Sequence, residues 1–162
     1  MDLNVIDTDG SLDGYLLTIK NDDVLINKIN TTDIIALPQK HTDDKYYFAK
    51  ETVDFVKYCR QNDQNHSYDI LSDGDIEKRT LHSFDIWLPI IFVASQVLLP
   101  IAINVVSDYI TDKRKGREDE EAQIDVTFEV KHKKKYKSIH FKGNAEQFNE
   151  TFKNVDLDRW FE

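Results

Sequence analysis

The chain has 162 residues with 30 Asp and Glu against 21 Lys and Arg, which gives a net charge of −9 and an isoelectric point near 5.0. This acidity argues against a general nucleic-acid binder, and we expect no specific readout of double-stranded DNA. A hydrophobic content of 40% is enough to fill a core, and the single cysteine, Cys59, excludes an internal disulfide framework.

Residues 1–84 are predicted to form a small acidic α+β module. Aliphatic and β-branched runs, separated by Asp-Gly and Asn-Asp-Asp turns, predict short strands at 15–19, 24–26 and 33–37. Apolar residues at helical intervals predict an amphipathic helix over 48–60, with Cys59 on its apolar face as a structural thiol. Residues 67–71 and 76–84 flank an Asp-Gly turn, which predicts a β-hairpin.

Motifs for metal binding and catalysis are weak. Residues 7–14 have the acidic composition of a calcium loop, but aligning Asp9-Gly10 with the EF-hand Asp-Gly puts Val5 at the first ligand position and no Glu at the twelfth. A plain acidic turn is therefore favoured. None of the five histidines has another His or Cys at zinc-ligand spacing, and the sequence has no Gly-rich phosphate loop or Gly-x-Ser-x-Gly motif. The sequence predicts no cofactor and no enzyme activity.

The middle of the chain is apolar. From Ile86 to Ser107 there are 22 residues without a charge. As a helix this run would be about 33 Å long, against a bilayer hydrocarbon core of about 30 Å. Trp87 and Tyr109 stand near its ends, and the basic run 113–117 follows, as at a membrane interface. The pattern predicts one long hydrophobic helix over 85–111 that spans a membrane.

Polar residues and prolines within this run share one side of the predicted helix. At about 100° per residue they fall within roughly 80° of one another, and they are Pro89, Gln96, Pro100, Asn104 and Ser107. Unpaired amides in lipid are costly, whereas a neighbouring copy of the helix would satisfy them. The stripe therefore predicts a homo-oligomer in which these residues form a helix–helix interface or line a pore.

The same run has a second interpretation as the buried central helix of a soluble protein, with the polar stripe facing solvent. Under the membrane interpretation the basic run places the C-terminal side in the cytoplasm. The acidic N-terminal module would then have to cross the membrane, unless both flanks start in the cytoplasm and the helix inserts late.

Residues 112–162 are predicted to form a β-hairpin followed by a helix. Polar and apolar residues alternate over 124–130 and 136–142, and Asn144 can cap the helix. The lysine-rich hairpin is either a solvated edge protected from aggregation or a surface for anionic lipid headgroups, a nucleotide or nucleic acid. The candidate contacts with an anionic ligand or lipid are Lys113, Arg114, Lys115, Arg117, Lys133, Lys134, Lys135 and Lys137.

The block from His82 to Pro89, the segments 99–101 and 104–110, the basic run and the C-terminal hairpin and helix together resemble small bacterial single-helix membrane proteins akin to effectors of anti-phage defence operons. The resemblance covers about residues 82–155 and rests on organisation. It implies a helix that disturbs the inner membrane when a partner releases it.

Two functions are therefore expected. The first is a self-associating single-pass effector of the bacterial inner membrane, pore-forming or membrane-perturbing, controlled by a regulatory protein or a nucleotide. The alternative is a soluble, cytoplasmic, acidic interaction protein, an inhibitor or immunity-type partner, whose apolar helix belongs to a core or an oligomer. The net charge of −8 over residues 1–85 favours a basic partner for this alternative.

Overall fold

The computed structural model describes residues 1–8, 15, 23–40, 45–72, 78–79 and 85–162, and the structural statements below concern these residues. Their strands form a six-stranded sheet in the order β1-β9-β8-β7-β2-β5 and a three-stranded sheet in the order β3-β4-β6. The elements are β1 (Asp2–Thr8), α2 (Asp23–Thr31), β2 (Ile34–Ala36), β3 (Gln39–Lys40), β4 (Tyr46–Ala49), α3 (Lys50–Asn62), β5 (Tyr68–Ile70), β6 (Lys78–Arg79), β7 (Ile86–Val93), η1 (Gln96–Leu98), α4 (Leu99–Lys113), β8 (Gln123–His132), β9 (Lys135–Asn144), α5 (Ala145–Asn154) and η2 (Leu157–Phe161).

The six-stranded sheet mixes parallel and antiparallel pairs. β7 and β8 are parallel neighbours joined through α4, whereas β8 and β9 form an antiparallel hairpin. β1 pairs antiparallel with β9, and β2 lies antiparallel to β7 and parallel to β5. Strands from each of the predicted segments 1–84, 85–111 and 112–162 therefore lie in one sheet.

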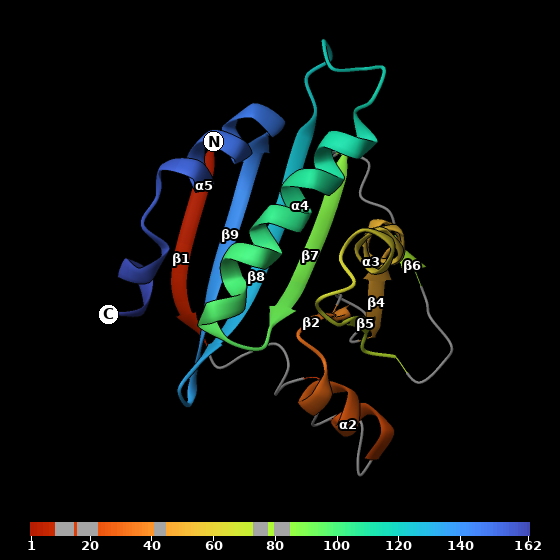
Figure 1. Ribbon diagram of the computed structural model, residues 1–162, viewed down its shortest axis with the longest axis vertical. Coiled ribbons are helices and arrows are strands. Elements are labelled where there is room, and N and C mark those ends of the chain that lie inside the picture. Colours follow the sequence, from red (N-terminus) through yellow and green to blue (C-terminus); the bar gives the residue numbers. More distant parts are fainter. Residues whose placement is uncertain (9–14, 16–22, 41–44, 73–77, 80–84) are drawn as a thin grey trace.

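One face of this sheet carries the main core. Figure 1 shows α4 lying across β7, β8 and β9, with α5 beside it. Side chains of α3, α4 and α5 pack with the inward side chains of the strands into one cluster of buried residues. Its aromatic part joins Phe141 and Phe148, whose ring centroids are 5.2 Å apart, with Phe152 and Phe128. Burial of these side chains is the main source of stability.

Asn144 starts α5 as the sequence predicts. Its side chain accepts a hydrogen bond from the Gln147 amide at 2.9 Å, and the Gln147 side chain accepts one from the Asn144 amide at 3.0 Å. This reciprocal pair satisfies two helix N-terminal donors. The strands over 124–130 and 136–142 and the helix after Asn144 are confirmed by β8, β9 and α5.

The predicted long hydrophobic helix over 85–111 is wrong. Residues 86–93 form strand β7, a short turn and η1 follow, and α4 begins only at Leu99. The described residues include no helix with both the length and the apolar composition needed to cross a bilayer. The charge-free run is therefore a buried strand followed by the core-facing helix that covers the same sheet.

The composition of β7 explains the strand. Five of its eight residues are Ile, Phe or Val, which favour extended backbone. A central strand covered on both faces is apolar throughout, so it lacks the alternation that marks a half-exposed strand. Pro89 lies where the register between β7 and β8 shifts, between Leu88 and Ile91. Such a bulge tolerates proline, which has no amide hydrogen for the ladder.

The N-terminal predictions have mixed outcomes. The strand at 33–37 and the helix over 48–60 are confirmed by β2 and α3. The strand at 24–26 is wrong, because these residues lie in α2 with Leu25 buried beneath it. The hairpin over 67–84 is wrong as well, since β5 pairs with β2 whereas β6 pairs with β4. Its turn at 73–75, residues 16–19 of the predicted strand 15–19 and residues 9–14 of the predicted acidic turn 7–14 lie outside the described residues, whereas Asp7 and Thr8 end β1.

Cys59 is buried on the inner side of α3, as the sequence predicts for a structural thiol. Burial, together with the nearby Asp63 carboxylate, raises the pKa of the thiol to about 12. The reactive thiolate is therefore scarce at neutral pH.

Asp63 closes the C-terminal end of α3, and its replacement tests a local network. Its Oδ2 accepts a hydrogen bond from the Tyr68 hydroxyl at 2.6 Å and lies 2.9 Å from His66 Nδ1. The Tyr68 hydrogen bond lowers the pKa of Asp63, with the His66 contact adding to the effect. We expect Asp63→Asn to lower the free energy of unfolding by about 1–2 kcal/mol at pH 7.

The lowered pKa of Asp63 determines how its contribution to stability depends on pH. The ionised carboxylate contributes stability above its unfolded pKa of about 3.9, and this contribution is lost as the pH falls through the lower folded value. In urea unfolding, the free energies of unfolding of the wild type and of Asp63→Asn should therefore converge as the pH falls below the folded pKa of Asp63. Asp54→Asn, an exposed change on the same helix, should stay within about 0.5 kcal/mol. An equal loss of stability in Asp63→Asn and Asp54→Asn at pH 7 would show that the contacts of Asp63 do not stabilise the fold.

Candidate functional site

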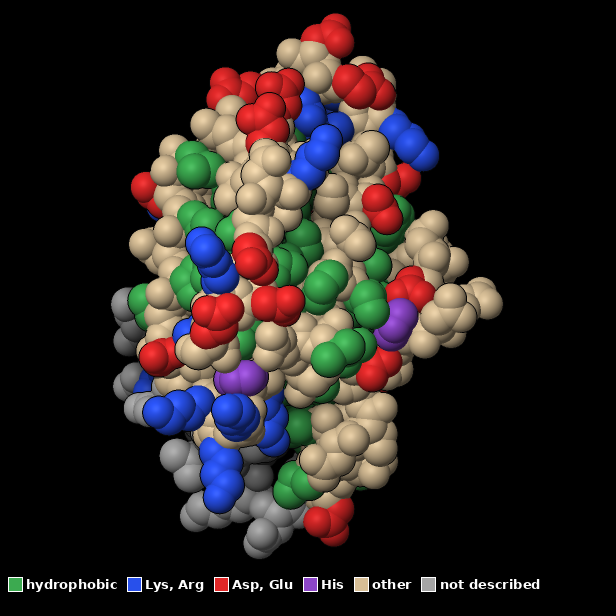
Figure 2. Space-filling view, turned by 60° about the vertical axis from the view of Figure 1, so that its left-hand side comes forward, with side chains coloured by type: hydrophobic (Ala, Val, Ile, Leu, Met, Phe, Trp, Pro, Cys, Tyr) green, Lys and Arg blue, Asp and Glu red, His purple; other side chains and the backbone are tan. Residues whose placement is uncertain are grey.

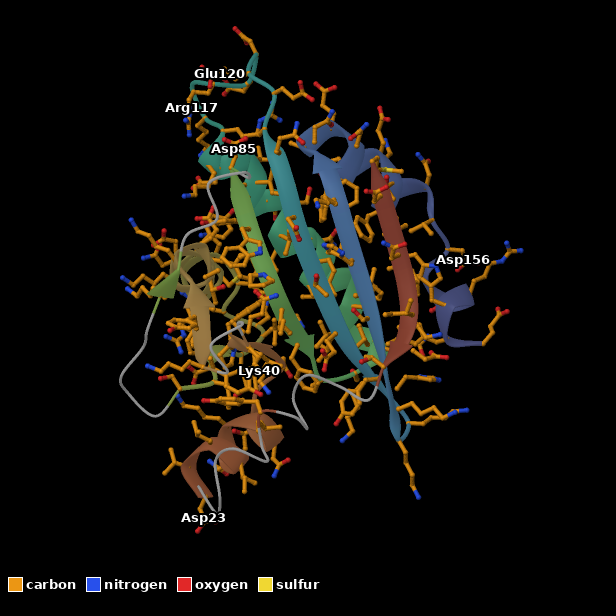
Figure 3. All side chains as sticks on the ribbon, turned by 180° about the vertical axis from the view of Figure 1, so that it is seen from behind. Asp23, Lys40, Asp85, Arg117, Glu120 and Asp156 are labelled. Carbon is orange, nitrogen blue, oxygen red and sulfur yellow. The ribbon has the colours of Figure 1, made fainter. Side chains whose placement is uncertain are left out.

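The second face of the six-stranded sheet is only partly covered. α2 packs over β2 and the end of β7 through a smaller core that includes Leu25, Leu37 and Phe92. Polar side chains occupy much of the face along β8 and β9, where Thr127 and His140 are register partners. Figure 3 looks onto this face, with Lys40 labelled near its lower border. A polar face of this kind is available to a ligand or partner.

A hollow of about 540 Å³ opens on this face, and we call it the sheet-face hollow. Its size is in the range of known ligand pockets, which span about 300–1,000 Å³. It combines aromatic, aliphatic, hydroxyl and charged side chains: Ile6, Thr8, Pro38, Gln39, Lys40, Tyr46, Trp87, Pro89, Ile90, Asp125, Thr127, Glu129, Ser138 and His140.

Trp87 and Asp125 meet in the sheet-face hollow. They are register partners on the parallel strands β7 and β8, so their side chains emerge next to each other on the same face. Trp87 is half-buried, and the Asp125 side chain is only 14% exposed. An indole face beside a shielded carboxylate suits a cationic group, which both would attract.

His140 orients the Asp125 carboxylate. Its Nε2 lies 2.8 Å from Asp125 Oδ1, so the ring donates to the carboxylate when Nε2 carries the proton. One carboxylate oxygen of Asp125 is therefore held by the protein.

Glu129 is a buried acidic residue in the lining of the hollow. It is 2% exposed, and it lies in register with Phe92 on one side and Ser138 on the other. Desolvation of a carboxylate is costly, so the burial of Glu129 requires compensating interactions within the protein.

The predicted stripe does not follow one helical face. Pro89 is buried in β7 and lines the sheet-face hollow, whereas Pro100 and Asn104 are exposed on α4. These positions lie on different elements, so the geometric premise of a continuous stripe is wrong. Pro100 occupies the first turn of α4, where its missing amide hydrogen costs nothing.

The remaining stripe residues have partners within the chain. Gln96 Nε2 donates to Asp158 Oδ1 at 3.3 Å, and Ser107 Oγ donates to Asn149 Oδ1 at 2.6 Å. These contacts connect η1 and α4 with the C-terminal segment. Gln96 and Ser107 are therefore satisfied by η2 and α5, whereas Asn104 is exposed on the outer side of α4.

The basic run after α4 organises the following loop. Arg114 Nη2 donates to the carbonyl oxygens of Glu118 and Glu120 at 3.0 and 2.8 Å, and Arg117 Nη2 donates to the Lys113 carbonyl at 3.3 Å. Figure 3 labels Arg117 and Glu120 at this upper end of the molecule. Both guanidinium groups thus bind main-chain oxygens.

The two lysines of this run lie in ion pairs. Lys113 Nζ is 3.0 Å from Glu51 Oε2 of α3, and Lys115 Nζ is 3.3 Å from Asp112 Oδ1. The four basic residues predicted here for an anionic ligand are accordingly engaged within the fold.

The lysines of the hairpin are arranged differently. The predicted residues Lys133, Lys134, Lys135 and Lys137 all line one cavity of about 590 Å³ at the tip of β8 and β9. The structure therefore brings this half of the predicted set together, at the end of β8 opposite to the 113–117 run.

Three residues of the sheet-face hollow were missed by sequence reasoning: Trp87, Asp125 and His140. Alternation along β8 and β9 places Asp125 and His140 on the polar face, so their shared face was available from the sequence. Their contact depends on strand register, and Trp87 joins them only because β7 is a strand parallel to β8. Within the described residues no cluster of His, Cys, Asp and Glu could hold a metal ion.

Comparison with known proteins gives no relative for this chain: no family model, no curated protein and no solved structure matches it.

Proposed function

We propose that this chain is an acidic interaction protein that binds a basic segment of a partner protein in the sheet-face hollow. A partner arginine or lysine would lie over the Trp87 ring and donate to Asp125. The observation that supports this is the register pairing of Trp87 with Asp125 inside a hollow of about 540 Å³. A cation over an indole gains more when it is desolvated, and a carboxylate at its side adds a charge-assisted hydrogen bond.

The charge of the whole chain supports a basic partner. A net charge of −9 attracts cationic segments over longer distances and speeds their association at low salt. The hollow then supplies the specific contact, since Asp125 is shielded from solvent and held by His140. Affinity should therefore fall with ionic strength, while the preference for a cation over a neutral isostere should persist.

We propose binding rather than catalysis at this site. Among the described residues, the hydroxyl groups of Thr127 and Ser138 make no hydrogen bond to the His140 ring. Activation of a hydroxyl nucleophile requires a base within hydrogen-bond reach. The His140–Asp125 pair thus serves to position a carboxylate in this proposal.

Titration with arginine peptides tests the proposal. The probe is the synthetic peptide acetyl-Arg-Gly-Arg-Gly-Arg-amide, with a citrulline peptide of the same length as its neutral match. In a Trp160→Phe background Trp87 is the single tryptophan, so its fluorescence reports the hollow. We expect the arginine peptide to change this fluorescence and to bind at least tenfold more tightly than the citrulline peptide.

Two charge-removing variants test whether Asp125 makes the contact with the arginine peptide. Asp125→Asn keeps the shape of the side chain and removes its charge, and it should weaken binding of the arginine peptide about tenfold or more. Glu150→Gln on the outer side of α5 removes one charge elsewhere and should change affinity less than twofold. Equal affinity for the arginine and citrulline peptides, or equal losses in the two variants, would overturn the proposal.

A further inference from the structure

We infer that the cavity at the tip of the β8–β9 hairpin binds a small organic phosphate with an aromatic group, of the nucleoside phosphate class. We call it the lysine cavity. It has a volume of about 590 Å³ and is lined by Asp7, His132, Lys133, Lys134, Lys135, Tyr136, Lys137, Phe161 and Glu162. Figure 2 shows Lys and Arg side chains gathered with a histidine at the lower end of the molecule.

The lysine cavity is positive on an otherwise acidic protein. Four lysines face two carboxylates there, although the chain as a whole has a net charge of −9. Lys137 pairs with Asp7 at 3.1 Å, whereas Lys133, Lys134 and Lys135 form no ion pair with any described residue. Cations that converge on one concave site without internal partners favour an anionic ligand with several charged oxygens.

The floor of the cavity is aromatic. Phe161 is 9% exposed, the His132 ring lies 5.1 Å from its ring, and Lys137 Nζ lies 5.9 Å above it. A bare inorganic anion would reach the lysines but would leave the apolar part of the lining, with the exposed remainder of Phe161, uncovered. A ligand with a planar ring and a phosphate would cover the floor and reach the lysines at the same time.

The turn itself carries a lysine where its backbone disfavours one. Lys133 has φ 58°, in the left-handed region that Gly and Asn adopt most easily. Gly or Asn would suit this backbone conformation better than lysine, and the presence of a lysine here supports a role for its charge in binding. Lys133→Asn therefore separates the two effects, because it should keep or improve the turn while it removes one of the converging charges.

The shape of the lysine cavity favours a small ligand over a polymer. Its four lysines come from the turn at 133–134 and the first residues of β9, and Asp7 and Glu162 line the same cavity. The net charge of −9 also repels an extended polyanion.

Calorimetric titration with ATP, adenosine and inorganic phosphate tests the inference on the full chain. We expect ATP to bind at least tenfold more tightly than either adenosine or phosphate, because only ATP fills both parts of the cavity. The ATP affinity should fall about fivefold or more in Lys133→Asn and in Lys134→Gln. It should stay within twofold in Lys153→Gln, an exposed lysine of α5.

Thermal unfolding provides the control for the fold. Lys133→Asn should have an unfolding temperature equal to or above that of the wild type. Absence of ATP binding at concentrations up to about 10 mM would overturn the inference, as would an unchanged affinity in Lys133→Asn. Binding to phosphatidylserine vesicles or single-stranded RNA that ATP does not displace would also overturn it. Because no Lys133 variant alters the sheet-face hollow, these results are independent of the arginine-peptide titration.

Discussion

Ile91→Asp is expected to abolish cooperative folding. The Ile91 side chain is fully buried in β7, where the residue is paired with Phe128 on one side and Ala36 on the other. A carboxylate at this position would lack both water and a partner, which costs several kcal/mol. Domains of this size are stable by only about 5–15 kcal/mol, so the variant should lose most of its folded population.

The matched change Asn104→Asp should be tolerated. Asn104 is exposed on the outer side of α4, and the change should alter the free energy of unfolding by less than about 0.5 kcal/mol. Urea unfolding followed by circular dichroism measures both variants. In a single membrane-spanning helix over 85–111 both positions would lie within the bilayer, and a new charge at either would be costly. Similar losses for the two variants would therefore contradict the strand–helix arrangement.

Phe141→Ala should lower the free energy of unfolding by about 3–5 kcal/mol. Phe141 is fully buried on β9, and its ring lies 5.2 Å from that of Phe148 and 6.0 Å from that of Phe152. Truncation removes these ring contacts and leaves a cavity between the sheet and α5.

The conservative variant Phe141→Leu separates cavity formation from loss of the aromatic contacts. We expect it to cost less than half as much as Phe141→Ala, because a leucine refills much of the space. In urea unfolding both variants should move the midpoint and leave the slope unchanged. A loss below about 1 kcal/mol for Phe141→Ala would show that the cluster contributes little to stability.

Local patterns predicted the elements that are half-exposed. The helix α3 and the strands β8 and β9 each have one buried and one exposed side, and this asymmetry produces a period of 3.6 or 2 in the sequence. β7 has no such period because it is covered on both faces. A buried strand followed by a helix gives the same unbroken apolar run as a membrane span, and only the tertiary structure separates the two.

The candidate sites were partly accessible from sequence. The hairpin lysines are neighbours along the chain, so their convergence on one cavity could be expected from the β-turn alone. The sheet-face hollow depends on Trp87, Asp125 and His140, which come from three strands. Their proximity follows from strand order and register, which short-range patterns do not specify.

The pairing of β1 with β9 sets the order in which the sheet is completed during synthesis. Asp2 is paired with Lys142, so β1 has to wait for a partner that is made about 140 residues later. At about 5–20 residues per second this delay is roughly 7–30 s. During that interval the nascent chain carries an unpaired segment, which a chaperone or a neighbouring nascent chain can bind.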